Sequence, residues 1–580
     1  MGAHRAAAVG SALRQAASLQ RWTDGPLAWP AGFAAPAMKS QTEIELKFLL
    51  PEAARSELAA EMARGSATLE RTSLAAMYLD TEDRRLARAG LAWRLRREGR
   101  RWVQTLKAGG SQTLERFEHE VIRPDASHDA SAHAGTAVGD QLMALLRRAQ
   151  ADGHEPGVRF QTQVRRTARR VRTRGAVVEV AFDEGRLLSA GSTQRIREIE
   201  FELISGSPTA MLALVERWRK RFGLIYDPRS KAERGDRLAL GLPFPPLRKA
   251  SRPDYAHEAV ATTAFGVVLD ECLAQITRNA IGLVEGAPTQ RVDHVHQLRG
   301  GIRRLRSALR SFQGWVPSPP ANLVEGLRSL FATLGMSRDS DVLDSGVAAE
   351  LVKAGAPALT LSGVAAGPDP ADAVRAAATQ RMFIAWITWR VAMAEAPAVR
   401  VVVEAAEAQV GETRAADATL PAEAVPQRSE VQEAGDVSDA ASVTPPARDD
   451  APSFHRNVQR RLRRWHRRIV ADWKAFDTLD EDSLHALRKR IKRQRYAVEF
   501  FAPVLRRRKI ERYLKALAVI QDRMGELNDL FVARDRYQPL VACDPAAWFA
   551  LGWLAARIAE LRALAKPELG RLAKVDPPTS

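Results

Sequence analysis

The stretch Glu43-Ile-Glu-Leu-Lys47 alternates charged and apolar residues, and this alternation recurs through the N-terminal part of the chain. Further runs with the same period begin at Leu91, Trp102, Val177 and Ile196. A period of two is typical of β-strands, because successive side chains point to opposite faces. Short strands at regular spacing between about residues 43 and 242 predict a closed antiparallel barrel.

Charged residues two positions apart form rows on several of these strands. In a barrel the second face of a strand can line the interior, so we expect a charged lumen. The alternative interpretation is a solvated outer face, whose cross-strand ion pairs each contribute well under ~1 kcal/mol. The rows comprise Glu43, Glu45 and Lys47; Arg94 and Arg96; Arg116, Glu118 and Glu120; and Glu198, Glu200 and Glu202.

The composition of these rows indicates the kind of ligand that the lumen would hold. Clustered carboxylates without His or Cys favour a hard divalent cation such as Mg²⁺ or Mn²⁺. Rows of Arg and Lys favour phosphate oxygens, to which Arg can donate two parallel hydrogen bonds. The pattern therefore predicts a site for a metal-bound polyphosphate.

These segments resemble the CYTH domain, the family of triphosphate tunnel metalloenzymes. The resemblance covers residues 39–245, and it implies an eight-stranded antiparallel β tunnel that binds a triphosphate and hydrolyses it with a divalent metal. The motifs that carry it, besides Glu43–Lys47, are Tyr78-Leu-Asp-Thr81, Gly90–Arg96, Thr105–Lys107, Arg116–Glu120, Val178–Asp183, Ile199–Leu203 and Ser230-Lys-Ala-Glu-Arg-Gly235.

The resemblance also implies roles for individual residues. The expected catalytic residues are Glu43, Glu45 and Lys47, and the expected metal ligands are Glu43, Glu45, Glu200 and Glu202. Glu118, Glu120, Asp183 and Glu198 are lumen residues without an assigned role, and Arg165 is an alternative to Arg166 because the register of that strand is ambiguous. The residues expected to bind the triphosphate are Lys47, Arg94, Arg96, Lys107, Arg166, Lys231 and Arg234.

From about residue 253 to 569 the apolar period becomes helical, and the sequence repeats itself. The segment His296–Arg306 returns 189 residues later as His485–Arg495, and Leu334–Val342 returns 190 residues later as Met524–Val532. Two matches at nearly one offset predict a duplicated, all-α helical bundle. The overall fold expected is therefore an α+β multidomain protein, with a β barrel followed by this bundle.

Each repeat places a row of cations on one helical face, separate from an apolar stripe. This region resembles the CHAD domain, the conserved-histidine α-helical domain. The resemblance implies that its basic surface binds inorganic polyphosphate; for a single helix, a solvated face is the competing interpretation. The expected polyphosphate-binding residues are His296, Arg299, Arg303, Arg306, His485, Arg488, Lys492 and Arg495.

Composition limits the remaining interpretations. The net charge of +18 favours a polyanionic partner, and two cysteines exclude a disulfide-stapled scaffold. No stretch has the apolar length of a membrane span, so a cytoplasmic location is expected. We expect residues 1–38 to form a disordered extension, either a targeting peptide or an over-long gene start before Met38. Residues 404–452 contain eleven acidic and three basic residues, and we expect them to form a disordered acidic insertion.

The sequence and its resemblances predict a metal-dependent inorganic triphosphatase, which forms pyrophosphate and phosphate, with a polyphosphate-binding helical domain. A thiamine or nucleoside triphosphatase or a class IV adenylate cyclase would use the same barrel. A non-enzymatic polyphosphate-binding protein is a further alternative. Nucleic acid is a less favoured partner, because few aromatic residues accompany the cations of the helical half.

Overall fold

The computed structural model describes residues 42–64, 68–109, 114–189, 191–342, 347–357, 367–395 and 450–578. The side chains of 336–342 and 451 are not part of this description. The expected disorder of residues 1–38 and of most of the acidic insertion falls outside the described residues. No helix in the described ranges combines the length and the apolar character that crossing a membrane requires.

Eight antiparallel strands close into a barrel in the ring order β1-β5-β4-β3-β2-β6-β7-β8, and a short β9 (Ile225–Tyr226) extends the sheet beside β1. The predicted fold class is confirmed. The strands are β1 (Thr42–Leu49), β2 (Glu70–Asp80), β3 (Leu91–Glu98), β4 (Arg101–Gly109), β5 (Glu115–Arg123), β6 (Gly157–Thr173), β7 (Ala176–Ser189) and β8 (Ser192–Gly206).

On β1 and β8, apolar side chains face outward beneath a helix, and charged side chains face the lumen. Leu46 and Phe48 of β1 and Phe201 of β8 are buried with the helix α5 (Pro208–Phe222). The Phe48 and Phe201 rings lie edge to face, with centroids 5.8 Å apart. Because side chains alternate along a strand, burial of these residues outside turns Glu45 and Lys47 inward.

Short helices cover the barrel and complete its wall. They are η1 (Glu52–Ala54), α2 (Arg55–Ala63), α3 (Arg85–Arg88), η2 (Ala130–His133), α4 (Ala137–Ala151) and α6 (Lys231–Ala239). The side chain of Ser230 caps α6 by accepting a hydrogen bond from the Glu233 backbone N–H. This cap fixes the start of the helix that carries Lys231.

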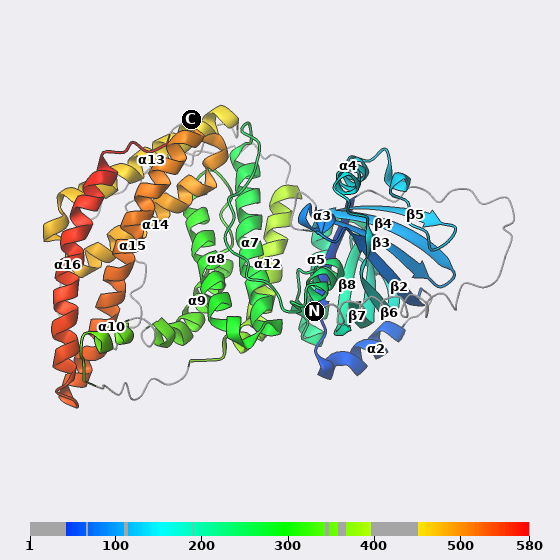
Figure 1. Ribbon diagram of the computed structural model, residues 1–580, viewed down its shortest axis with the longest axis horizontal. Coiled ribbons are helices and arrows are strands. Elements are labelled where there is room, and N and C mark those ends of the chain that lie inside the picture. Colours follow the sequence, from blue (N-terminus) through cyan, green and yellow to red (C-terminus); the bar gives the residue numbers. More distant parts are fainter. Residues whose placement is uncertain are drawn as a thin grey trace, which may run out of the picture.

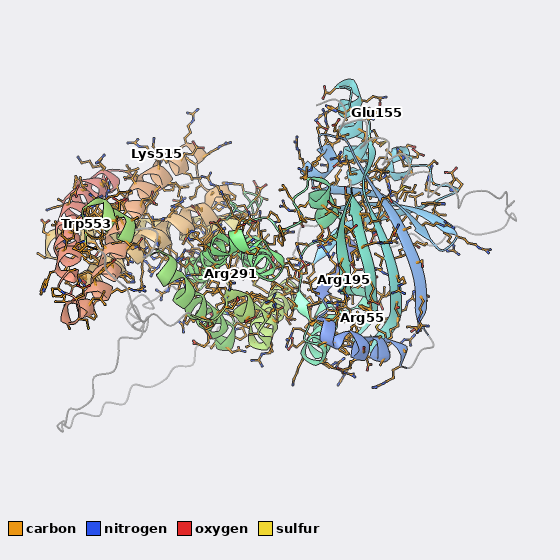
Figure 2. The ribbon with its side chains drawn as sticks, turned by 60° about the horizontal axis from the view of Figure 1, so that its bottom comes forward. Arg55, Glu155, Arg195, Arg291, Lys515 and Trp553 are labelled. Atoms are coloured by element: carbon orange, nitrogen blue, oxygen red, sulfur yellow. The ribbon has the colours of Figure 1, made fainter. Side chains whose placement is uncertain are left out.

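The second domain is helical, and Figure 1 shows it beside the barrel. The repeated helices α8 and α14 contact one another. In Figure 2, Trp553 on α16 and Arg55 on α2 lie in the helical domain and the barrel domain, respectively. The helices are α7 (Ala261–Glu285), α8 (Arg291–Phe312), α9 (Ala321–Val342), α10 (Ala348–Lys353), α11 (Pro370–Arg375), α12 (Ala377–Glu395), α13 (Ala451–Lys474), α14 (Glu481–Phe500), α15 (Arg507–Tyr537) and α16 (Ala547–Ala573), with 3-10 turns at Pro288–Gln290, Phe476–Thr478, Ala502–Val504 and Gln538–Ala542.

The helical domain docks on the barrel mainly through α12, which packs against α5. Ile384 and Ile387 of α12 belong to the same buried apolar cluster as the outer face of β1 and β8. The buried Gln380 accepts a hydrogen bond of 2.8 Å from the backbone N–H of Tyr226. Shared core and a buried hydrogen bond hold the two domains in one arrangement.

Candidate active site

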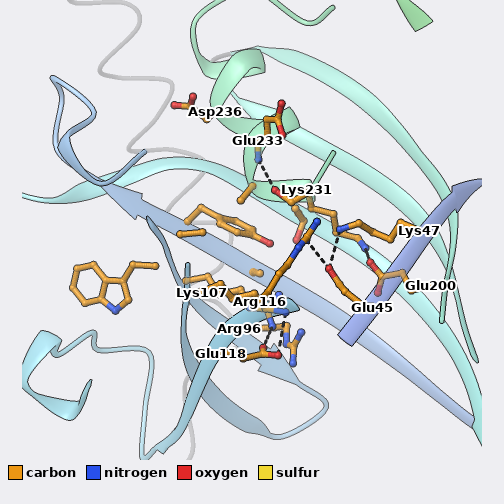
Figure 3. Close-up of a pocket in the computed structure, with 18 of the residues that line it drawn as sticks. Glu45, Lys47, Arg96, Lys107, Arg116, Glu118, Glu200, Lys231, Glu233 and Asp236 are labelled. Atoms are coloured by element: carbon orange, nitrogen blue, oxygen red, sulfur yellow. Dashed lines mark hydrogen bonds and ion pairs between the residues drawn. The ribbon is translucent and has the colours of Figure 1, made fainter. Parts of the chain in front are cut away.

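The interior of the barrel is a cavity of about 860 Å³ lined mainly by charged side chains. Figure 3 shows labelled acids and bases that point toward one another around it. Arg234 lies outside the lining, and Arg165 is exposed whereas Arg166 lines the cavity. Of the four lumen residues without an assigned role, Glu118, Glu120 and Asp183 line the cavity and Glu198 does not. The predicted site residues in the lining are Glu43, Glu45, Lys47, Arg94, Arg96, Lys107, Arg166, Glu200, Glu202 and Lys231.

One group of ion pairs surrounds the two acids of β1. Lys107 Nζ lies 2.8 Å from Glu43 and 3.1 Å from Glu118, while Arg116 Nη1 lies 2.6 Å from Glu45. Burial raises the pKa of Glu43 to about 7, with Lys107 opposing the shift and Glu45 adding to it. Burial alone would raise the pKa of Glu45, but Lys47, Lys107 and Arg116 lower it to about 2. Glu45 is therefore ionised at neutral pH.

A second group joins acids of β7 and β8. Oxygens of Asp183, Glu198 and Glu200 lie within 4.8 Å of one another. Lys231 Nζ reaches all three, at 2.7, 2.5 and 2.9 Å. Burial opposes ionisation of Asp183, yet Arg166 and Lys231 hold its pKa below the ordinary value. This group is thus three carboxylates held together by an ammonium and a guanidinium.

Two neighbouring arginines of β3 lie beside carboxylates of β5. Arg94 lies 3.6 Å from both Glu118 and Glu120, and Arg96 lies 3.5 Å from Glu120. Burial and the adjacent Arg94 lower the pKa of Arg96. An anion between the two guanidinium groups would relieve this repulsion, as expected for a phosphate-binding position.

Arg234 has a different place from that predicted. Its side chain is 4% exposed, with Nη1 2.8 Å from Glu198 and Nη2 donating to the Arg195 carbonyl oxygen at 2.7 Å. It therefore holds a carboxylate that contacts Lys231. The assignment of Arg234 to direct triphosphate binding remains a prediction.

The cavity also contains residues to which the sequence reasoning gave no role. Arg116 shares the predicted row with Glu118, so its strand position was the available signal. Glu179 lies inside the quoted motif Val178–Asp183, so its strand position was also available. The remaining residues had no motif signal; among them, Arg278 comes from α7 of the helical domain. Besides Arg116, the lining residues without a predicted role include Arg84, Arg159, Glu179, Asp236 and Arg278.

The predicted cations of the helical domain differ in exposure. His296 and His485 are exposed, and His485 Nδ1 lies 2.8 Å from Asn528 Oδ1. Arg299 is only 6% exposed; its Nη1 donates to the Phe331 carbonyl oxygen at 2.7 Å, and its guanidinium lies 4.0 Å from the Phe331 ring centre. Arg299 therefore contributes to the packing of α8 against α9. The half-buried members of the set are Arg303, Arg306, Arg488, Lys492 and Arg495.

A glycine of the repeated motif makes room for this arginine. A Cβ at Gly335 would lie 2.6 Å from Arg299 Nη1, too close for any larger residue without a shift. The sequence reasoning also missed cations on α13, where Arg468 lies with Arg490 and Arg493 of α14 around Trp465.

Comparison with known proteins identifies both domains. Residues 41–235 match the CYTH domain model, and residues 267–538 match the CHAD domain model. A curated relative, the inorganic triphosphatase of Haemophilus influenzae, is 30% identical over 198 residues. That match covers 33% of this chain and 54% of the relative, so the chain spans about half the length of the curated relative it matches.

Solved structures give further similarities. The CHAD domain of the plant Ricinus communis is 26% identical, covers 58% of this chain and 99% of its own, and has a TM-score of 0.39. A Hippeastrum protein described as having a dominant triphosphatase activity is 20% identical, covers 34% of this chain and 96% of its own, and has a TM-score of 0.26. The two domain matches show that the chain belongs to the proteins in which a CYTH domain is followed by a CHAD domain.

Proposed function

We propose that the barrel is a metal-dependent inorganic triphosphatase that converts triphosphate to pyrophosphate and phosphate. The observation that carries this proposal is the tunnel itself, in which two groups of carboxylates alternate with Arg and Lys at ion-pair distance. The matched part of the Haemophilus influenzae inorganic triphosphatase supports the same activity.

The acids fit a hard divalent cation, because every donor in the two groups is a carboxylate oxygen. We assign Glu43, Glu45, Glu200 and Glu202 to the metal, with Asp183 and Glu198 beside them. Mg²⁺ or Mn²⁺ bound there would neutralise charge on the phosphoryl group that is transferred. Lys231 now occupies the space among Asp183, Glu198 and Glu200, so these acids have a cation in place of a metal.

The cations fit the phosphate chain. Lys47, Lys107 and Lys231 are each paired with a carboxylate in the structure, as are Arg94, Arg96 and Arg166. When a metal satisfies the carboxylates, these cations gain phosphate oxygens as partners. They would then hold the chain in line with an attacking water, which is the main protein contribution to phosphoryl transfer.

The helical domain would bind longer polyphosphate through the half-buried Arg and Lys side chains of α8 and α14, with His296 and His485 beside them. Because these two helices contact one another, their cations belong to one region of the domain. This part of the proposal concerns binding only, and the chemistry remains in the barrel.

The activity is tested with purified full-length chain. Phosphate release is measured from inorganic triphosphate, thiamine triphosphate and ATP, each with Mg²⁺ and Mn²⁺, and cyclic AMP formation is assayed in parallel. We expect inorganic triphosphate to have the highest kcat/KM. A higher value for either organic triphosphate, or cyclic AMP as the product, would reassign the barrel to one of the other enzymes.

The site is tested by Glu43→Ala and Glu45→Ala, for which we expect phosphate release to fall at least 100-fold while the protein stays folded. Glu184→Ala is the matched control, because Glu184 is an acid of β7 that pairs with Arg55 outside the cavity. Full activity in both site variants would contradict the assignment.

A further inference from the structure

One residue of the helical domain lines the barrel cavity. Arg278 lies near the end of α7, where its neighbours Thr277 and Asn279 are buried in the helical domain. Its side chain points the other way and contributes to the cavity lining together with Glu45, Lys47 and Lys231. The substrate cavity of the barrel is therefore incomplete without the second domain.

Arg278 is held in this place by an ion pair across the domain boundary. Its Nη1 lies 2.6 Å from Glu233 Oε1 on α6. Glu233 belongs to the capped first turn of α6, the turn that also presents Lys231 to the carboxylate group. A guanidinium has five N–H donors, so the bond to Glu233 leaves donor capacity for another anion.

The segment between the domains is fixed at the same point. Asn279 Nδ2 donates to the Arg248 carbonyl oxygen at 2.8 Å, and Asn279 Oδ1 accepts from the Arg248 N–H at 3.2 Å. Pro246 of this segment also lines the cavity. Of these two neighbouring residues of α7, Asn279 binds the connecting segment and Arg278 reaches the cavity.

The docking contacts of α12 reach the catalytic strand β1. Gln380 binds the N–H of Tyr226, and the next N–H, of Asp227, donates to the Lys47 carbonyl oxygen at 3.0 Å. The helical domain is thereby connected by two hydrogen bonds to the backbone of Lys47. Its position relative to the cavity is set by buried contacts, which gives Arg278 a defined location.

We propose that Arg278 is a substrate-positioning residue that the helical domain supplies to the tunnel, where it receives a terminal phosphate of the inorganic chain. The inference rests on the proposed triphosphatase function. A terminal phosphate carries more charge than an internal one, and a guanidinium binds it with two parallel hydrogen bonds. Arg278 would therefore strengthen binding of the chain without taking part in bond cleavage.

The test compares variants of the full-length chain. Arg278→Gln is expected to raise KM for inorganic triphosphate about tenfold and to leave kcat within twofold, while Arg278→Lys recovers part of the loss. Arg557→Gln is the matched control: Arg557 also pairs at 2.6 Å with an acid, Glu560, and is similarly exposed at 38% against 32%, but it lies on α16. The KM and kcat of Arg557→Gln should match those of the wild type.

A second control separates positioning from docking. Glu395→Gln weakens the contact of α12 with Ser207 without changing a cavity residue, and it should leave KM unchanged. An equal rise in KM for Glu395→Gln and Arg278→Gln would overturn the proposal, as would an unchanged KM for Arg278→Gln.

Calorimetric binding of inorganic triphosphate with Mg²⁺ gives a readout that does not depend on turnover. If the wild type hydrolyses no triphosphate, the proposed function fails, and binding still decides the role of Arg278. Tenfold weaker binding by Arg278→Gln supports the role, and equal binding overturns it.

Discussion

Arg166 of β6 and Asp183 of β7 form a two-pronged ion pair inside the tunnel, with Nε–Oδ1 and Nη2–Oδ2 distances both of 2.8 Å. Asp183 is fully buried, and Lys231 Nζ also contacts it. Removing the charge of Asp183 would break this buried pair and leave Glu200 as the acid that Arg166 and Lys231 share.

Asp183→Asn should therefore destabilise the barrel by about 3 kcal/mol. Inorganic triphosphate should recover part of this loss, because a phosphate can accept the donors of Arg166 and Lys231. Thermal unfolding with and without triphosphate measures both effects. The control is Asp125→Asn on the surface, which should change neither the stability nor the effect of triphosphate. An Asp183→Asn variant as stable as the wild type would show that the ion pair does not stabilise the barrel.

Metal and triphosphate should bind cooperatively. The metal takes the carboxylates away from the paired cations, and the phosphates then give those cations new partners. Without ligands, Lys107 neutralises Glu43 and Arg116 neutralises Glu45. A metal alone would have to displace these cations, and a phosphate alone would leave buried carboxylates unpaired. We expect the triphosphate affinity to rise at least tenfold when Mg²⁺ is present, as measured by calorimetry at constant ionic strength. Equal affinity with and without metal would exclude this exchange of partners.

The barrel was predictable because apolar and charged residues alternate along several of its strands, β1 and β8 among them. Leu46 and Phe48 pack under α5, and the alternation along β1 therefore turns Lys47 into the lumen. A period of two thus predicts the outer and the inner face of the strand together. Arg278 carried no such signal, because α7 is an amphipathic helix of another domain and its contact with Glu233 is fixed only by docking.

The sequence also could not separate binding residues from those that support them. Arg234 and Lys231 lie in one motif, yet Arg234 pairs with Glu198 outside the cavity while Lys231 lines it. Arg299 shares a helical face with Arg303, but it lies at the border of the apolar stripe and turns onto Phe331. The direction of a side chain at such a border depends on the helix packed against it, and the periodicity of the sequence does not identify that helix.

The buried His133 should make the stability of the barrel depend on pH. Burial and the adjacent His119, whose Nδ1 lies 2.9 Å away, lower the pKa of His133 from 6.5 to about 4. Between these values the unfolded chain binds the proton and the folded chain does not, so stability falls as the pH decreases from 6.5 to 4.

A His133→Gln variant removes this proton uptake, and its stability should fall less over that interval, by roughly 1–3 kcal/mol. Unfolding midpoints of both proteins from pH 8 to pH 4 measure the difference, with the offset at pH 8 as reference. Parallel curves would mean that His133 takes up its proton equally in both states.

Binding of long-chain polyphosphate should depend on the cations of α8 and α14 and not on the barrel. Reversing Arg303, Arg488 and Lys492 to Glu should weaken polymer binding at least tenfold and reduce its salt dependence, since fewer phosphates are then neutralised. Arg299 is left intact, because its hydrogen bond to Phe331 supports the fold. Hydrolysis of triphosphate should stay within twofold. A control with Lys353, Lys515 and Arg557 reversed has the same net charge, so an equal loss of polymer binding there would reduce the effect to overall charge.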